Sequence, residues 1–262
     1  MYVPLHRVFH FSYSKTDHIV FKNKRVWITG ASSGIGEALA RALAARGANL
    51  ILSARNEAEL QRVAQDALEA GAGAVLVQPL DLERHDTLPE IVKNVLQQTG
   101  KVDLLINNGG VSQRALALET DLDTDKKLMN VNYFGTIALT KAILPHMLTH
   151  QLGHIVTITS LTGKFGSPYR SSYAAAKHAL HGFFDSLRAE LAHTPIRITL
   201  VCPGFIRTNV SVNALTGKGT PLGTMDDATG KGMHPDRLAQ KILYAVERNR
   251  EEVYFGGKEV FA

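Results

Sequence analysis

Cysteine is almost absent from this sequence, and long apolar runs are absent altogether. Cys202 is the only cysteine in the 262 residues, which excludes an internal disulfide and leaves the redox compartment unassigned. It ends an apolar run, a position that suits a small buried side chain better than a nucleophile. No stretch approaches the roughly 20 consecutive apolar residues of a membrane-spanning helix.

The aromatic-rich segment 1–23 lacks the uninterrupted apolar core of a signal peptide. Basic or ionisable side chains break it at four points: His6, Arg7, His10 and Lys15. We interpret the segment as an extension ahead of the first strand, and a short segment lying on a membrane surface is the alternative. A cytoplasmic protein is expected, with peripheral membrane association left open.

The charge pattern is moderately basic but contains no long basic block. The formal net charge is +5 and the pI is about 9.3, with the positive side chains dispersed along the chain. This pattern argues against nucleic-acid binding. An anionic cofactor would account for some of the basic residues equally well.

The order of apolar segments indicates a single α/β domain over residues 24–262. A hydrophobic content of 45% is ordinary for a soluble globular protein, and no change in composition marks a linker. Most expected strands are apolar on both faces, as in a parallel sheet covered by helices on both sides. Strands are expected at 24–29, 49–54, 74–78, 102–106, 155–159, 197–201 and 252–255. Helices are expected after residue 34 and at 57–70, 87–98, 123–150, 171–193 and 236–249.

The first strand runs directly into a glycine-rich turn, residues 30–36, and then into a helix. The spacing Gly30-x-x-x-Gly34-x-Gly36 lets the backbone approach an anion, and the helix N-terminus receives its charge. Such turns also join strands to helices where no ligand binds. The arrangement therefore predicts a phosphate-binding turn, which the other motifs must support.

Residues after the second and third strands indicate which dinucleotide would bind. An acidic residue near the end of the second strand would favour NAD, whereas residues 49–56 contain none and offer Arg55 instead. We therefore expect NADP(H), with Ser32 and Ser33 adding hydroxyl contacts to its 2′-phosphate. Asp81 follows the third strand and could accept from the adenine amino group. An exposed arginine and a turn aspartate are the alternative interpretations of Arg55 and Asp81.

Two groups of amides could hydrogen-bond neighbouring segments or line a cleft. Asn107-Asn108-Gly109-Gly110 follows the fourth strand as a tight turn that could line a cofactor site. Asn132 stands in the middle of a predicted helix, where its amide competes with helical hydrogen bonds. Such an Asn is often a surface residue, but one that faces a cleft could hold a water molecule.

Tyr173 and Lys177 are four residues apart on a predicted helix and therefore share a face. An ammonium beside a phenol favours phenolate and lowers the pKa of the tyrosine, as a general acid/base requires. Ser160, at the end of the fifth strand, can bring a hydroxyl to the same point. Tyr254 and Lys258 repeat the spacing, but Gly256 and Gly257 between them disfavour a helix, and we discard that pair.

Residues 205–233 form a long segment without clear periodicity, which is typical of a lid over a site or of a disordered segment. Several apolar residues within it weakly suggest an apolar substrate wall: Phe205, Ile206, Val210, Val212, Leu215 and Leu222. No histidine pair has the context of a metal site, and no metal is expected.

Taken in order, these motifs resemble those of the short-chain dehydrogenase/reductase family over about residues 24–255. The resemblance is carried by Thr29 to Gly36, Asn107 to Gly110, Asn132, Ser160, Tyr173-x-x-x-Lys177, Pro203-Gly204 and Thr208. Gly109 stands where that family usually has Ala, and Thr159 where a second Ser is frequent. The nearest likeness is to an orphan branch whose substrates are poorly defined and some of whose members associate with membranes.

The resemblance implies a three-layer Rossmann fold with a seven-stranded sheet in the order 3-2-1-4-5-6-7. It implies Asn132, Ser160, Tyr173 and Lys177 as catalytic residues. It implies cofactor contacts from Gly30, Ser32, Ser33, Gly34, Ile35, Gly36, Arg55, Asp81, Asn107, Gly109, Tyr173, Lys177, Pro203, Gly204 and Thr208. A homodimer or homotetramer, paired through helices 123–150 and 171–193, is implied by analogy.

The implied activity is NADP(H)-dependent hydride transfer between a carbonyl and an alcohol, with Tyr173 as the general acid/base. In that scheme Lys177 lowers the pKa of Tyr173, Ser160 orients the substrate oxygen, and Asn132 holds a water behind Lys177. Two alternatives are a 3-oxoacyl carrier-protein reductase and a non-catalytic NADP(H)-binding regulator. The intact catalytic set argues against the regulator, because a sensor needs no proton relay.

Overall fold

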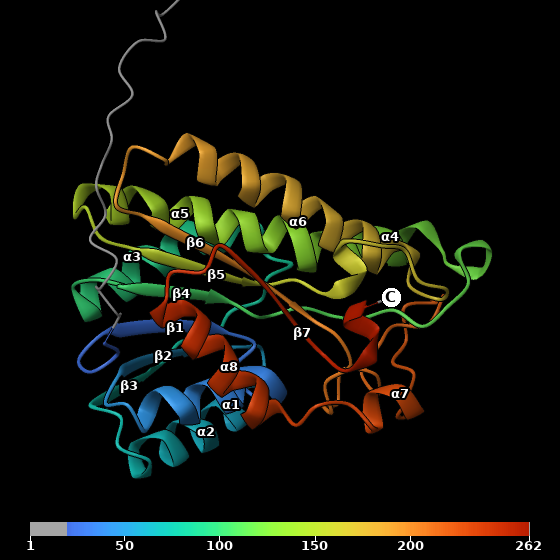
Figure 1. Cartoon of the computed structure of the whole chain (residues 1–262), viewed down its shortest axis with the longest axis horizontal. Coiled ribbons are helices and arrows are strands. Elements are labelled where there is room, and N and C mark those ends of the chain that lie inside the picture. Colours follow the sequence, from blue (N-terminus) through green and yellow to red (C-terminus); the bar gives the residue numbers. More distant parts are fainter. Residues whose placement is uncertain (1–19, 262) are drawn as a thin grey trace, which may run out of the picture.

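The computed structural model describes residues 20–261, which form three layers around one parallel sheet (Figure 1). The sheet has seven strands in the order β3-β2-β1-β4-β5-β6-β7, which confirms the predicted order. The strands are β1 (Arg25–Thr29), β2 (Asn49–Ser53), β3 (Ala74–Val77), β4 (Leu104–Asn107), β5 (His154–Ile158), β6 (Arg197–Pro203) and β7 (Glu252–Phe255). The predicted extension falls mainly on residues 1–19, outside the described part.

The strands are apolar in succession because both faces of the sheet are covered. In β1, Val26 and Ile28 belong to one apolar core, and Trp27 between them belongs to the other. Side chains of a strand alternate between faces, so a continuous apolar run fills two cores at once. All three of these side chains are fully buried.

Helices divide between the two faces of the sheet, as Figure 1 shows. One face carries α1 (Gly34–Ala44), α2 (Glu57–Glu69) and α8 (Pro235–Glu247). The other carries α3 (Leu88–Thr99), α5 (Gly135–Thr149) and α6 (Ser171–Glu190), with α4 (Leu122–Met129) at its end. In residues 20–261 no helix combines the length and apolarity that crossing a bilayer requires.

The single helix expected at 123–150 is instead three segments. A π-helical turn, Asn130–Phe134, lies between α4 and α5. Within it, the Asn132 amide donates to the Leu128 carbonyl at 2.9 Å and to the Val111 carbonyl at 2.9 Å. Sequence periodicity does not resolve one wide turn inside a helix, and such turns are frequent at functional sites.

Other boundaries differ slightly from expectation. Helix α6 ends at Glu190 rather than His193, and β6 continues to Pro203. The segment 205–233 contains a short helix, α7 (Asp227–Gly230). Helix ends are the least certain part of any assignment from pattern alone, because the last turn lacks intrahelical partners.

Phe21 packs into the core beside α1 and α8, ahead of the expected domain start. Its side chain is 2% exposed, and the Arg46 guanidinium lies 5.8 Å from its ring centroid. Asn23 N–H donates to the Gly47 carbonyl at 2.8 Å. The folded domain therefore includes residues just before Lys24.

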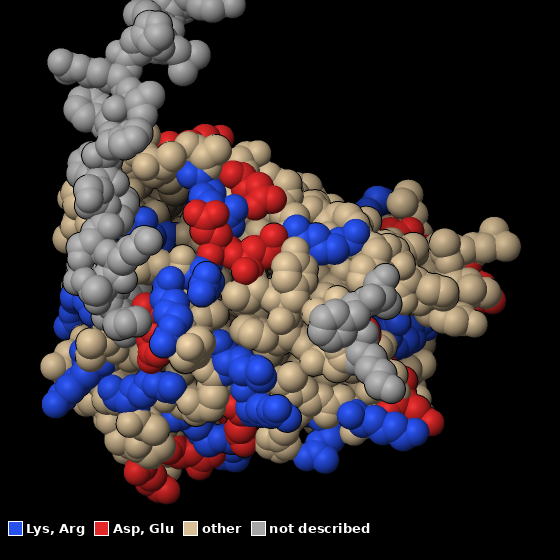
Figure 2. Space-filling view, viewed as in Figure 1, with Lys and Arg blue, Asp and Glu red and all other residues tan. Residues whose placement is uncertain are grey.

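On the face shown in Figure 2, Lys and Arg side chains are interspersed with Asp and Glu. Several of them pair, as where Arg41 Nη2 lies 2.6 Å from the Asp236 carboxylate. This view shows no uniform basic surface of the kind that binds nucleic acid.

Candidate active site

A cavity of about 280 Å³ opens at the carboxyl ends of the strands, where ligands bind in open parallel sheets. It brings together the four predicted catalytic residues, which span residues 132–177 of the chain. Its lining also includes Ile35, Pro203, Gly204 and Thr208 from the predicted cofactor set. Residues that the sequence did not single out line it too: Arg114, Thr162, Phe165, Ser167, Arg170 and Glu259.

Ser160 and Tyr173 meet inside this cavity. The Ser160 hydroxyl accepts from the Thr162 N–H at 3.2 Å and from the Thr162 hydroxyl at 2.9 Å. It is also hydrogen-bonded to the Tyr173 phenol. The Ser160 and Tyr173 hydroxyls therefore lie together in an otherwise mainly apolar cavity. At this point they could both hydrogen-bond the oxygen atom of a ligand.

The pKa of Tyr173 is raised above its ordinary value of 10.0. Burial is the largest influence, and the Ser160 hydrogen bond and the charges of Arg170 and Arg114 oppose it. Tyr173 keeps some solvent contact, but its surroundings are dense enough for dehydration to disfavour phenolate. The sequence assigned the lowering influence to Lys177, whereas in the structure the Ser160 hydrogen bond and then the charges of Arg170 and Arg114 exert it.

Lys177 lies behind Tyr173 as a buried cation. Its side chain is 5% exposed, and Nζ donates to the Ile158 carbonyl at 2.9 Å. Nζ lies 5.7 Å from the centroid of the Tyr173 ring. Burial lowers the pKa of Lys177 to about 8, so its charge is lost within an accessible pH range.

We expect the stability of the wild-type protein, relative to a Lys177→Met variant, to rise between pH 8 and 10. Below pH 8 both the folded and unfolded states hold the Lys177 proton. Between a folded pKa of about 8 and the ordinary 10.5, the unfolded state binds more protons, so raising the pH favours folding. The difference in unfolding free energy should grow by up to about 1.4 kcal/mol per pH unit.

Urea titrations of both proteins at several pH values measure this difference. The exposed lysine of α5, in a Lys141→Met variant, controls for loss of a positive charge. A difference that stays constant from pH 8 to 10 would show that Lys177 is not dehydrated as the structure indicates.

Asn132 is held by the backbone of Val111. Its Oδ1 accepts from the Val111 N–H at 3.1 Å, and its amide group donates to the Val111 carbonyl and to Leu128. A Cβ on Gly110 would lie 2.5 Å from Asn132 Oδ1 and 3.8 Å from Lys177 Nζ, so both side chains lie beside Gly110. Both donors of the amide are occupied, so only its oxygen has capacity left for a water.

Gln113 fixes the start of α6, and the sequence contained no signal for it. Its Oε1 accepts from the N–H groups of Ser172 at 3.0 Å and Tyr173 at 3.2 Å. Gln113 is fully buried. Helix N-termini leave their first N–H groups without helical partners, so this amide both caps α6 and positions the Tyr173 backbone.

The glycine turn has the geometry of an anion cradle. Gly30 and Gly34 have φ angles of 65° and 59°, which glycine adopts without strain. Ser33 is the N-cap of α1, and within residues 20–261 its side chain makes no cap bond. The first N–H groups of α1 are thus free of intrahelical partners and face outward, where Ser32 and Ser33 are also accessible.

The turn after β4 braces this cradle. The Asn108 amide donates to the carbonyls of Thr29 at 3.0 Å and Gly30 at 3.2 Å. Asn107 instead turns inward and donates to the Thr140 hydroxyl at 3.0 Å, so its side chain does not face the cavity. A Cβ at Gly109 would lie 2.7 Å from the tip of Leu82, which explains why glycine is accommodated here in place of alanine.

Arg55 and Asp81 occupy different situations beyond the sheet edge. Arg55 is exposed just after β2, and within residues 20–261 it has no hydrogen-bond or ion-pair partner. Asp81 Oδ1 accepts from the Glu83 N–H at 3.0 Å and so stabilises its own turn. Arg55 is available to an anion, whereas the Asp81 carboxylate already has a structural partner.

The segment after β6 lies against the glycine turn. A Cβ at Gly34 would lie 3.1 Å from the Thr208 methyl group, so the two predicted cofactor segments are neighbours. Glu259 reaches the same region, where it accepts from Phe205 N–H at 3.1 Å and from Gly257 N–H at 2.9 Å. Two predicted cofactor segments that are far apart in sequence thereby lie side by side.

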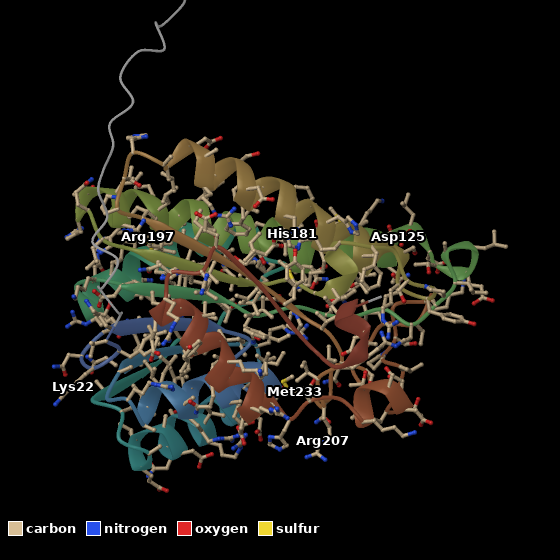
Figure 3. All side chains as sticks on the ribbon, viewed as in Figure 1. Lys22, Asp125, His181, Arg197, Arg207 and Met233 are labelled. Carbon is tan, nitrogen blue, oxygen red and sulfur yellow. The ribbon has the colours of Figure 1, made fainter. Side chains whose placement is uncertain are left out.

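The ends of the segment 205–233 are joined, as expected for a lid. Met233 N–H donates to the Phe205 carbonyl and Arg207 N–H to the Met233 carbonyl, each at 2.9 Å; Figure 3 labels Arg207 and Met233. Farther along, the Arg114 guanidinium contacts the Asp226 carboxylate at 2.6 Å. Burial raises the pKa of Asp226, but hydrogen bonds from Thr229 and Arg114 outweigh burial and leave that pKa lowered. This ion pair fastens the segment to the cavity wall.

His181, Cys202 and Glu252 meet behind Ser160, with one ligand atom of each within 4.8 Å of the others. Figure 3 places His181 on α6. The Glu252 carboxylate is already paired with Lys164 Nζ at 2.7 Å. Burial raises the pKa of the Cys202 thiol to about 12, which disfavours the thiolate that a nucleophile or a metal ligand needs. This pKa fits the role expected of Cys202, a small buried side chain.

The fold and site together define a nucleotide-binding oxidoreductase of the Rossmann type. One solved structure with this fold is a short chain dehydrogenase/reductase from Burkholderia phymatum in complex with NAD. It has a TM-score of 0.82 and 25% identity and covers 90% of each chain. Another is an alcohol dehydrogenase from Thermococcus sibiricus complexed with 5-hydroxy-NADP, with a TM-score of 0.76, 27% identity and coverage of 90% and 97%.

The sequence comparison narrows this class to a family. Residues 24–218 match the family model described as short chain dehydrogenase, and the chain belongs to that family. A Drosophila melanogaster protein named dehydrogenase/reductase SDR family protein 7-like is 48% identical, covering 88% of this chain and 72% of that one. Human dehydrogenase/reductase SDR family member 7 is 44% identical, with coverage of 87% and 69%.

Proposed function

We propose that this protein is an NADP(H)-dependent oxidoreductase that interconverts a carbonyl and an alcohol. The observation that carries the proposal is the pair of hydrogen-bonded hydroxyls, Ser160 and Tyr173, with the buried Lys177 ammonium behind them. A carbonyl oxygen placed between the two hydroxyls would accept hydrogen bonds from both. This arrangement supports polarisation of a carbonyl and transfer of one proton to its oxygen.

The chain's residues fit a dinucleotide phosphate. A Cβ at Gly36 would lie 2.2 Å from the Gly30 carbonyl oxygen, so the turn is closed to any larger residue and its backbone approaches a ligand directly. The unpaired Arg55 guanidinium lies beyond it, where a 2′-phosphate would meet a cation. Bound NADPH supplies hydride from its nicotinamide ring.

Each catalytic side chain contributes one separate action. Tyr173 donates its phenolic proton to the substrate oxygen and recovers a proton afterwards through the Lys177 side of the cavity. Ser160 holds the substrate oxygen in line with Tyr173. Asn132 fixes the Val111 backbone beside Lys177 through its paired hydrogen bonds. Phe165, Phe205 and neighbouring apolar groups exclude water from the reacting oxygen.

The raised pKa of Tyr173 favours carbonyl reduction at neutral pH. A phenol that keeps its proton is ready to act as the acid, whereas alcohol oxidation requires phenolate. We therefore propose reduction as the faster direction near pH 7, with oxidation gaining as the pH rises.

An Arg55→Gln variant tests the cofactor assignment. The wild type should oxidise NADPH faster than NADH at low cofactor concentration with aldehydes, ketones, steroids and acyl thioesters as acceptors. Loss of one charge-assisted contact should raise KM for NADPH by roughly 10- to 100-fold and leave KM for NADH nearly unchanged. Steady-state rates with both cofactors measure the change.

Arg84→Gln, an exposed arginine outside the site, is the matched control for net charge. A wild-type preference for NADH, or equal effects of Arg55→Gln on both cofactors, contradicts the role of Arg55. Failure of every acceptor to be reduced, with tight NADPH binding, would favour the non-catalytic regulator instead.

A further inference from the structure

Arg170 is a partly buried cation in the wall of the substrate cavity. It is the N-cap of α6, three residues before Tyr173. Its Nη1 donates to the Ser167 hydroxyl at 3.2 Å, and its guanidinium carbon lies 5.8 Å from the Phe205 ring centroid. Within residues 20–261 it forms no ion pair, although burial and the Arg114 charge lower its pKa. A dehydrated guanidinium without a carboxylate is costly unless something else balances its charge.

The other charges of the cavity are already engaged. Arg114 is neutralised by Asp226 through contacts of 2.6 and 3.2 Å to the same carboxylate oxygen. Lys177 is held by the Ile158 carbonyl on the far side of Tyr173. The Glu259 carboxylate is satisfied by the N–H groups of Phe205 and Gly257. Among residues 20–261, Arg170 is a guanidinium of the cavity wall that forms no ion pair, although the Asp226 carboxylate acts on it at longer range.

We propose that the substrate is a keto or hydroxy acid whose carboxylate binds Arg170 while its carbonyl or alcohol oxygen lies between Ser160 and Tyr173. This inference rests on the proposed oxidoreductase function and names the substrate class for that same site. A single free guanidinium matches a monoanion, and its planar fork suits the two oxygens of a carboxylate.

The cavity lining between Arg170 and the Ser160–Tyr173 pair indicates what the rest of the substrate is like. Phe165, Leu161 and Phe205 offer apolar surface in the same cavity. Arg170 and Tyr173 line the same cavity of about 280 Å³, where one ligand could contact both side chains. An apolar linker between carbonyl and carboxylate is therefore part of the recognised structure.

The test compares phenyl keto acids with two, three or four methylenes between carbonyl and carboxylate, each against its neutral amide. NADPH oxidation is followed across a range of pH. Rates are compared on the pH-independent plateau of each profile, because loss of the Arg170 charge also raises the pKa of Tyr173. For the best spacer, the wild type should prefer the acid at least tenfold. Arg170→Gln should raise KM for the acid by roughly 10- to 100-fold and should affect the amide far less than the acid.

Two further variants separate charge recognition from structural damage. Arg170→Lys keeps a cation and should restore part of the preference for the acid. Arg237→Gln, on the exposed surface of α8, removes the same charge away from the cavity and should change neither substrate. Equal turnover of acid and amide by the wild type, or equal losses of both in Arg170→Gln, overturns the proposal.

A binding measurement tests the carboxylate site separately from the proposed oxidoreductase activity. Calorimetry of the best keto acid with the NADPH-bound Tyr173→Phe variant should give binding that weakens when Arg170→Gln is added. If no acid or amide is reduced yet this binding and its loss are seen, the oxidoreductase proposal fails while the anion site remains. If the amides are reduced and the acids are not preferred, the oxidoreductase proposal stands and the anion site is overturned.

Discussion

Tyr173→Phe is expected to lower turnover by roughly 10²- to 10⁴-fold while NADPH still binds. The substitution removes one oxygen and leaves the ring in place against Lys177, whose Nζ lies 5.7 Å from its centroid. Without the phenolic proton, Ser160 alone can hydrogen-bond the substrate oxygen, and no positioned acid protonates it. Stopped-flow or steady-state NADPH oxidation measures the loss, and NADPH fluorescence titration measures cofactor affinity.

Tyr169→Phe provides the matched control for this experiment. Tyr169 is an exposed tyrosine four residues earlier in the chain, 55% exposed and outside the cavity lining. Its phenol should be dispensable, with turnover within about twofold of the wild type. Wild-type turnover by Tyr173→Phe would rule out Tyr173 as the general acid and with it the proposed mechanism.

Gly36→Ala is expected to abolish measurable NADPH binding and to destabilise the fold. Its new Cβ would lie 2.2 Å from the Gly30 carbonyl oxygen and 2.7 Å from the Asn108 amide nitrogen. Both contacts are far below van der Waals separation, and one is to backbone, so the turn or α1 must move. Overpacking of this kind costs about 1–3 kcal/mol of unfolding free energy. Chemical denaturation and NADPH titration give the two quantities.

Gly182→Ala makes the same substitution where there is room. Gly182 lies within α6, and a Cβ built on it meets no atom within 4 Å among residues 20–261. Alanine has the higher helix propensity, so stability should rise by up to about 1 kcal/mol with NADPH affinity unchanged. Wild-type affinity in Gly36→Ala would show that the cradle tolerates displacement and does not bind the phosphates.

Local patterns were sufficient to predict the strands and to place Tyr173 beside Lys177. Apolar runs such as that of β1 place side chains in both cores, and this is visible from composition alone. Tyr173 and Lys177 share a helix face because four residues make about one turn. The strand order and the full catalytic set were implied by the family resemblance; the order is confirmed, and the four residues line one cavity.

The prediction was weaker where a side chain hydrogen-bonds to backbone that is distant in sequence. The π-helical turn around Asn132 depends on Val111, and the capping of α6 depends on Gln113. Neither contact has a sequence spacing that reveals it. The Asn107 side chain was expected to line the cofactor site, but its amide group donates to the Thr140 hydroxyl on α5.

The sequence by itself determined the class of fold, the glycine cradle and the chemical groups available for catalysis. It did so because propensity, periodicity and turn chemistry act over a few residues. Only the tertiary structure decided the electrostatics of the site. Arg114 is neutralised by Asp226, 112 positions away, whereas Arg170 has no such partner among residues 20–261. Charge balance in a cavity depends on distances through space, and folding alone sets those distances.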